Sequence, residues 1–216
     1  GYGGTTAPSE VSDYTMLHIV GDMVELVSAL GEKQAAIVGH DWGALVAWSC
    51  ALLRPDLFTS VAGMSVPFVP VASVDILSAL RDAGVDHFYL QYFQAPAEAE
   101  LEQDVAASIR RMHYSASGDG PDTVTFGMLK TGKGILDNTV EPETLPAWLS
   151  ERDVEEYASE FQRTGFSGGL NWYRNIRRSS ELMAPWRGQA IHQPSLFIAG
   201  EADDVLKFPN AQADID

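Results

Sequence analysis

The stretch "AAIVGHDWGALVAWSC", residues 35–50, decides the fold of this chain. Residues 35–38 form a short apolar run, which is typical of a strand fully buried on both faces of a sheet. Residues 44–53 predict a helix, which begins almost at once after the strand. The connection, residues 39–43, reads Gly-His-Asp-Trp-Gly. An acidic side chain between two glycines is a poor element of a core, so the pattern indicates that Asp41 is presented to a ligand.

A Gly-x-nucleophile-x-Gly sequence between a strand and a helix is the nucleophile elbow, in which glycines permit a strained turn. The helix that follows favours an anion at its start, and the N–H of Trp42 is expected to stabilise an oxyanion there. A carboxylate is already ionised at neutral pH, so Asp41 needs no base to become a nucleophile. It suits displacement at a saturated carbon, which gives an ester that water can cleave. The alternative is that Asp41 only caps the helix.

The surrounding sequence predicts a parallel α/β sheet. Residues 15–30 carry apolar side chains at helical spacing, and a glycine follows them as a stop. Residues 59–69 predict the next strand, and residues 194–200 predict a later one. Strand, helix and strand with short connections are typical of a mostly parallel sheet flanked by helices.

Residues 70–189 predict helices and loops but no convincing strand. One helix is expected at 97–114 and another at 149–165, where Ser150 and Asp153 form a capping box. A long turn-rich connector lies between these helices, and loops of that length are often functional. We therefore expect an α/β core interrupted by a helical insertion, with core at residues 1–69, a helical cap or lid at 70–190 and further core at 191–216.

Composition narrows the class of protein. Lys and Arg number 14 against 30 for Asp and Glu, so the net charge is −16, which argues against nucleic acid and anionic membranes as partners. No apolar run has the length of a membrane span, and no ligand cluster or phosphate loop implies a metal or an organic cofactor. The single cysteine, Cys50, is expected to be a buried packing residue and indicates a reducing compartment, the cytoplasm.

Five segments together resemble the epoxide hydrolases of the α/β-hydrolase fold, closest to the soluble epoxide hydrolase type. The resemblance covers essentially all 216 residues. Its motifs are "GYGGTTAP" at the start, "VGHDWGA" at the elbow, "FYLQYFQAPAEAELEQ" at 88–103, "GGLNWYRN" at 168–175 and "GEADDVL" at 200–206.

The resemblance implies Asp41 as the catalytic nucleophile and two cap tyrosines that hold the epoxide oxygen. The tyrosines correspond to Tyr89, aligned on the "QYFQ" that follows, and to Tyr173 in "NWYRN". The acid that orients the catalytic histidine corresponds to Asp203, with Asp204 as the second choice. The pocket that the resemblance implies is aromatic, with Phe93 and Trp172 among its residues, so an apolar epoxide is the expected substrate and a homodimer one candidate assembly.

The chemistry of a phenol suits this role, because a group with a pKa of about 10 keeps its proton until an alkoxide forms. Two phenols can share the developing charge and fix the orientation of the ring. The structural alternative is that Tyr89 and Tyr173 only pack at an interface, as we expect for Tyr92 and Tyr157.

The sequence also departs from the family's pattern. The family needs a histidine after the acid to activate water, yet none follows Asp203; the five histidines are His18, His40, His87, His113 and His192. The His-Gly-x-Pro loop that would donate the second oxyanion N–H is also not in this sequence. The chain begins with Gly1 rather than Met, and we expect it to be an incomplete piece of an enzyme.

Two other functions remain open. A haloalkane dehalogenase uses the same aspartate elbow, with Trp42 as a halide donor, but its lid does not need paired tyrosines. A non-catalytic ligand-binding protein that kept the fold is the second alternative. A serine-type esterase is excluded by Asp41 itself.

Overall fold

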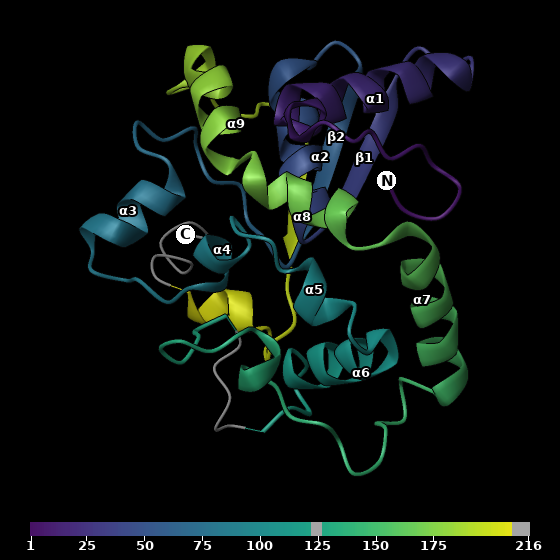
Figure 1. Cartoon of the computed structure of the whole chain (residues 1–216). Coiled ribbons are helices and arrows are strands. Elements are labelled where there is room, and N and C mark those ends of the chain that lie inside the picture. Colours follow the sequence, from purple (N-terminus) through teal and green to yellow (C-terminus); the bar gives the residue numbers. More distant parts are fainter. Residues whose placement is uncertain (122–126, 209–216) are drawn as a thin grey trace. The chain divides into compact units, whose positions relative to one another are not determined.

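The computed structural model describes residues 1–121 and 127–208 (Figure 1). The chain forms two compact units. The helical unit consists of Gly1–Ser12 and Ile76–Asn175, and the sheet unit consists of Asp13–Asp75 and the chain from Ile176 onward. Residues 1–12 thus cluster with the helical unit, whereas the domain bounds expected from the sequence, 1–69, 70–190 and 191–216, stay a prediction.

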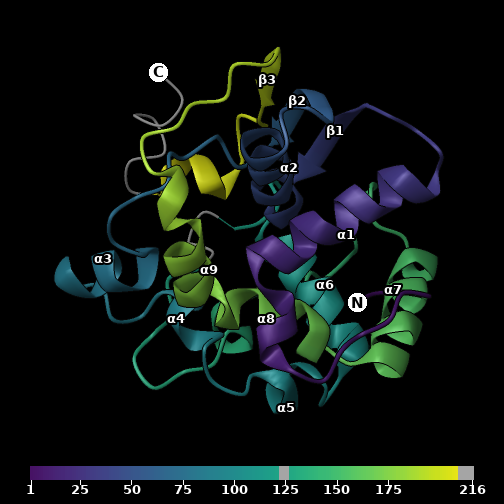
Figure 2. The ribbon, with the colours of Figure 1, turned by 90° about the horizontal axis from the view of Figure 1, so that it is seen from above.

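The sheet unit contains three parallel strands among the described residues: β1 (Ala35–His40), β2 (Phe58–Met64) and β3 (Ser195–Ile198). Strand β2 lies between the other two (Figure 2). His40 pairs with Met64, and Met64 pairs with Ile198, so the three strands end at one edge of the sheet. The residues that follow β1 and β3 therefore leave the sheet at the same edge.

The other elements of the sheet unit are helical. The predicted helix at 15–30 is α1 (Met16–Ala29), with Thr15 as its N-cap and Gly31 beyond its end at φ 75°. The remaining elements are α2 (Trp42–Leu53), α9 (Ile176–Met183), and the short 3₁₀ turns η3 (Ala184–Trp186) and η4 (Asp204–Lys207); a further turn, η1 (Val11–Tyr14), precedes α1.

Helix α2 packs closely against β1 and β2 (Figure 1). Its inner face is made of small residues and Trp48, whose indole N–H donates to the Val66 carbonyl at 3.0 Å. A Cβ at Gly63 of β2 would overlap the Trp48 ring, so glycine is needed there for the helix to approach the sheet. Cys50 is fully buried on the same helix, as expected, and burial raises its pKa to about 12.

Two expectations for these strands were wrong. β1 is not buried on both faces, because α2 packs on the face of Ile37 while Val38 on the other face is 63% exposed. The second predicted strand was too long: β2 ends at Met64, since Ser65 has φ 69° and turns the chain out of the extended conformation.

The helical unit contains α3 (Ile76–Asp82), α4 (Tyr89–Tyr92), α5 (Glu98–Leu101), α6 (Val105–Ser115), η2 (Leu136–Asn138), α7 (Glu151–Thr164) and α8 (Ser167–Arg174). Its described residues form no strand, only the isolated bridge between Phe88 and Met128. The core includes Phe93, Leu101, Ile109, Ile135 and Val154. Part of the predicted connector, residues 122–126, lies outside the described residues.

The single helix predicted at 97–114 was wrong, because it is split into α5 and α6. Asp104 adopts an extended conformation, and its carboxylate accepts from the Ala107 N–H at 3.0 Å, which starts a new helix. The buried Ser108 hydroxyl donates to the Leu101 carbonyl at 2.9 Å across the break.

The predicted helix at 149–165 is confirmed as α7. Ser150 and Asp153 form the expected capping box, in which the Ser150 N–H donates to the Asp153 carboxylate at 2.8 Å. Gly165 ends the helix at φ 70°, a conformation that glycine adopts without strain. No helix in the described part of the chain is long and apolar enough to cross a membrane.

Candidate active site

Asp41 occupies the turn between β1 and α2 in a strained conformation. Its φ of 54° and ψ of −118° are rare for a residue with a side chain, and such a conformation costs about 1–3 kcal/mol. The turn is held from both sides: the Asp41 N–H donates to the Met64 carbonyl at 3.1 Å, and the Ala44 N–H donates to the Asp41 carbonyl at 3.0 Å. Strain of this kind persists where the surrounding structure enforces it, and it is often found at functional sites.

The two glycines of the elbow differ in what the structure requires of them. A Cβ at Gly39 would overlap the Gly43 carbonyl, so glycine is needed where the start of α2 crosses β1. A Cβ at Gly43 would meet no atom within 4 Å. The expectation that both glycines permit the strained turn is therefore corrected: Asp41 itself carries the positive φ, and Gly39 supplies the room.

The Asp41 carboxylate lies at the N-terminus of α2 and is half-buried. One of its oxygens accepts the Trp42 N–H at 2.6 Å. The start of a helix carries a partial positive charge, which stabilises an anion at this place. The same hydrogen bond makes Asp41 the N-cap of α2, so capping and presentation of a carboxylate coexist in one geometry.

Asp203 follows β3 at the edge of the sheet where β1 also ends. It is the N-cap of η4, and its carboxylate accepts the Val205 N–H at 2.9 Å. The neighbouring Asp204 instead pairs with Lys207, whose ammonium lies 2.6 Å from its carboxylate. Asp204 is thus held in an ion pair within η4, whereas Asp203 accepts a backbone hydrogen bond.

The structure brings the two predicted tyrosines of the helical unit together. Tyr89 starts α4 and Tyr173 lies on α8, and their ring centroids are 5.8 Å apart in an edge-to-face arrangement. Phe93 packs against both, with centroid distances of 5.7 Å to Tyr89 and 4.9 Å to Tyr173. Gln94 joins the two segments further, because its side-chain amide donates to the Tyr173 carbonyl at 2.9 Å.

Phe93 and Trp172, the predicted pocket residues, differ in exposure. Phe93 is 4% exposed and belongs to the core of the helical unit. Trp172 is half-buried on α8, beside Tyr173 in the chain. Their contact with a substrate stays a prediction.

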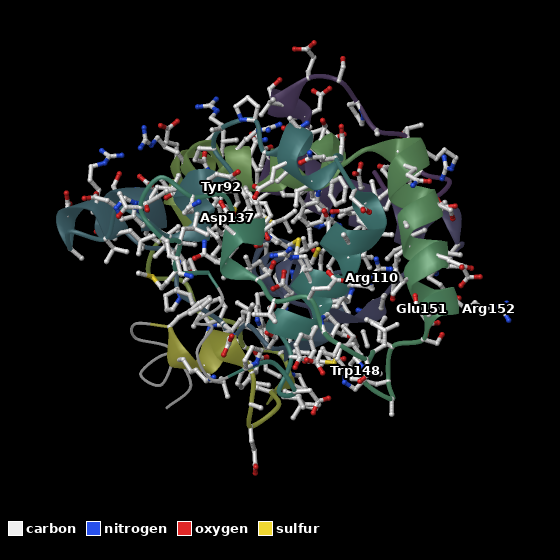
Figure 3. All side chains as sticks on the ribbon, turned by 60° about the horizontal axis from the view of Figure 1, so that its bottom comes forward. Tyr92, Arg110, Asp137, Trp148, Glu151 and Arg152 are labelled. Atoms are coloured by element: carbon white, nitrogen blue, oxygen red, sulfur yellow. The ribbon has the colours of Figure 1, made fainter. Side chains whose placement is uncertain are left out.

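Tyr92, which is expected from the sequence only to pack, also makes a polar contact. The Tyr92 hydroxyl donates to the Glu100 carboxylate at 2.5 Å, and Asp137 lies nearby (Figure 3). Burial, followed by the hydrogen bond and charge of Glu100, raises the pKa of Tyr92 to about 12. No local sequence signal could identify this pair, because α4 and α5 are joined by a turn whose path the sequence does not specify.

Three of the histidines make polar contacts, two of them with residues no more than four positions away in the chain. His18 Nδ1 lies 2.8 Å from the Thr15 hydroxyl, and His113 Nδ1 lies 2.9 Å from the Ile109 carbonyl. His87 Nε2 lies 3.3 Å from the Thr131 hydroxyl. Within residues 1–121 and 127–208, no group of three or more His, Cys, Asp or Glu side chains is placed to hold a metal ion.

Comparison with known proteins identifies the family. The family described as alpha/beta hydrolase fold matches residues 1–215. Epoxide hydrolase A of Mycobacterium tuberculosis is 44% identical over 96% of this chain and 66% of its own length, and an epoxide hydrolase of Caballeronia sordidicola is 41% identical over 94% and 61%. The chain thus spans slightly less than two thirds of the length of these relatives.

A solved structure gives the same result. Epoxide Hydrolase A from Mycobacterium thermoresistibile has a TM-score of 0.90 and 42% sequence identity, and the match covers 98% of this chain and 68% of that one. The mouse protein named Bifunctional epoxide hydrolase 2 is 35% identical over 96% of this chain and 37% of its own length. The chain therefore belongs to the α/β-hydrolase fold family, and the relatives that it resembles within that family are epoxide hydrolases.

Proposed function

We propose that this protein hydrolyses epoxides to vicinal diols through a covalent ester on Asp41. The observation that carries the proposal is the Asp41 turn, in which a carboxylate is held between a strand and a helix at φ 54° with the Trp42 N–H on one oxygen. A position that normally carries a serine here carries a group that is nucleophilic without a base.

In the first step, a carboxylate oxygen of Asp41 attacks a carbon of the epoxide. A C–O bond forms, the ring C–O bond breaks, and its electron pair moves to the epoxide oxygen. We assign Tyr89 and Tyr173 as the acids that hold this oxygen and supply its proton. Their close packing in the helical unit supports the assignment, because two neighbouring phenols can share one developing charge.

In the second step, water attacks the carboxyl carbon of the ester, and the bond to the alkoxide oxygen breaks to release the diol. The Trp42 N–H is assigned to stabilise the oxyanion that forms on Asp41. Water must lose a proton to a base, and Asp203 is assigned to orient that base. None of the five histidines of the chain is assigned as the base, since none follows Asp203 in the sequence.

A single turnover of the complete protein in ¹⁸O-labelled water tests the covalent route, with styrene oxide as the probe and protein in excess. The label is expected in the peptide that contains Asp41, while the diol of this turnover carries none. The control is Asp41→Asn, which keeps the size and capping ability of the side chain but removes the charge. Label in the first-turnover diol would mean direct attack by water and would contradict Asp41 as nucleophile.

A haloalkane dehalogenase is the second candidate, because the Asp41 turn with its neighbouring Trp42 fits that reaction as well. Halide release from a bromoalkane, measured beside diol formation from styrene oxide, separates the two activities. The similarity to epoxide hydrolases and the paired tyrosines favour the diol. An apolar epoxide as the natural substrate, a homodimer and a cytoplasmic location stay predictions.

A further inference from the structure

The Glu100 carboxylate gathers three hydrogen bonds from two other segments of the helical unit. The Tyr92 hydroxyl of α4 donates at 2.5 Å. The backbone N–H of Leu136 donates at 2.9 Å and that of Ile135 at 3.2 Å. Glu100 itself lies on α5, so one carboxylate joins α4, α5 and the start of η2. Hydrogen bonds to a charged acceptor are among the strongest in proteins.

Gly134 makes room for this carboxylate. A Cβ at Gly134 would overlap the Glu100 carboxyl group. The backbone conformation of Gly134 is not left-handed, so the chain does not need glycine there for its own path. Glycine is needed because the carboxylate comes so close to the backbone.

The Tyr92 hydroxyl is a hydrogen-bond donor that stays protonated at neutral pH. Burial and the negative charges of Glu100 and Asp137 raise its pKa to about 12, so it keeps its proton at any working pH. Figure 3 shows Tyr92 next to Asp137, in agreement with that influence. The Tyr92 hydroxyl can therefore donate to Glu100 at neutral pH.

The orientation of α4 depends on its end contacts, because a helix of four residues has little stability of its own. At its start, the Tyr89 N–H donates to the Gly127 carbonyl at 2.7 Å. At its end, Tyr92 is held by Glu100. Tyr89 and Tyr92 are one turn apart, so their side chains project to similar sides of the helix. A rotation of α4 that moves Tyr92 must also move Tyr89.

We propose that Tyr92 and Glu100 are positioning residues for Tyr89, and that their hydrogen bond fixes the direction in which the Tyr89 hydroxyl points. This inference rests on the proposed function, in which Tyr89 is an acid of ring opening. Positioning of this kind affects rate strongly, since a misplacement of about 1 Å can cost about 10²-fold.

The test is a set of single-turnover measurements on the complete protein with styrene oxide, in which quenched samples are analysed by mass spectrometry for the ester adduct. Tyr92→Phe removes one hydroxyl and keeps the ring. It is expected to lower the rate constant of adduct formation about 10-fold, the equivalent of one charged hydrogen bond. The rate constant of ester hydrolysis and the total amount of diol formed should stay unchanged. A purely structural effect would lower the amount of active protein and leave the rate constants alone.

Two further variants reach the same pair without touching Tyr89 or Tyr92. Glu100→Gln keeps the size of the acceptor and removes its charge, and Gly134→Ala places a methyl group where the carboxylate lies. Both are expected to slow ring opening in the same way as Tyr92→Phe. The matched control is Tyr157→Phe, because Tyr157 is 47% exposed on α7 and stacks on His113. It should leave both steps unchanged.

The double variant Tyr89→Phe/Tyr92→Phe identifies the route of the effect. If Tyr92 acts through Tyr89, the double variant should be no slower than Tyr89→Phe alone. This inference would be overturned if Tyr92→Phe slowed ring opening by the same factor in the wild-type protein and in Tyr89→Phe. It would also be overturned if folded Tyr92→Phe and Glu100→Gln opened the ring at an unchanged rate. Either result would leave the proposed function standing. An unchanged rate in Tyr89→Phe itself would instead remove Tyr89 from the proposed function, and the inference would fall with it.

Discussion

Two nitrogens of the Arg174 guanidinium lie 2.8 and 2.9 Å from the two carboxylate oxygens of Glu98. This planar, two-point contact ties α8, where Tyr173 precedes Arg174, to the start of α5. Both side chains are less than 20% exposed, with values of 17% and 19%. The Ser167 hydroxyl adds a further hydrogen bond to Glu98 at 2.9 Å.

The first prediction concerns the dependence of stability on pH. The hydrogen bond from Arg174, above all, lowers the pKa of Glu98 to about 2 from an ordinary 4.5. A lowered pKa contributes stability that is fully present above pH 4.5 and is lost as the pH falls toward 2. The contribution at neutral pH is at most about 3 kcal/mol. Chemical unfolding of Glu98→Gln should show a lower free energy of unfolding at pH 7 and a weaker loss between pH 4.5 and 2.

The control for this prediction is the Arg54–Asp56 ion pair, at 2.7 Å, whose side chains are 40% and 66% exposed. Water and salt screen such a pair, so Asp56→Asn should change the unfolding midpoint little. An equal loss in both variants would mean that the burial of the Glu98–Arg174 pair is unimportant.

The second prediction concerns the two tyrosines. Tyr89→Phe or Tyr173→Phe alone should slow ring opening about 10²-fold, because each removes one donor from the developing alkoxide. The double change should nearly stop adduct formation. The measurement is the rate of ester formation in a single turnover, with Tyr157→Phe as the control. If the double variant formed the ester at an unchanged rate, Tyr89 and Tyr173 would only pack against Phe93 and would not act as acids.

How much of this arrangement the sequence predicts depends on the range of the interactions. The turn at Asp41 and the ends of α7 were predictable, because glycines, a capping box and a helix stop act within a few residues. The split between α5 and α6 was not, although Asp104 is a good N-cap residue. The residues on both sides of Asp104 favour a helix, so the local sequence signal for one continuous helix was the stronger one. The contact of Ser108 with Leu101, which spans the break, exists only after folding.

The partners of the tyrosines were also beyond prediction from the sequence. The alignment on "QYFQ" placed Tyr89 by resemblance, but its contact with Tyr173 joins residues far apart in the chain. The bond from Tyr92 to Glu100 depends likewise on how α4 and α5 pack. The end of β2 at Ser65 depends on a backbone conformation that serine rarely adopts.

The third prediction separates the two glycines of the elbow. Gly39→Ala should destabilise the protein by roughly 1–3 kcal/mol or more, because its Cβ would overlap backbone atoms that cannot move without shifting α2. Gly43→Ala is the matched control and should be tolerated, since its Cβ meets nothing within 4 Å. Thermal unfolding of both variants checks this. Equal destabilisation would show that the crossing of α2 over β1 differs from the one described.

The last prediction concerns the 216 residues as a protein in their own right, and it follows from the separation of the two steps. Ring opening needs Asp41, Tyr89 and Tyr173, which the chain contains. Ester hydrolysis needs a base for water, and a carboxylate such as Asp203 is a weak base near neutral pH. Among the described residues the Trp42 N–H donates to the Asp41 carboxylate. The sequence contains no His-Gly-x-Pro loop to donate a second N–H, and loss of one such donor commonly costs about 10²–10³ in rate. The folded chain should therefore be alkylated once by styrene oxide and then stop.

Mass spectrometry should show one adduct, on the peptide that contains Asp41, without steady release of diol. Sustained turnover would show that one of the five histidines acts as the base, and the assignment of the hydrolytic step would be wrong.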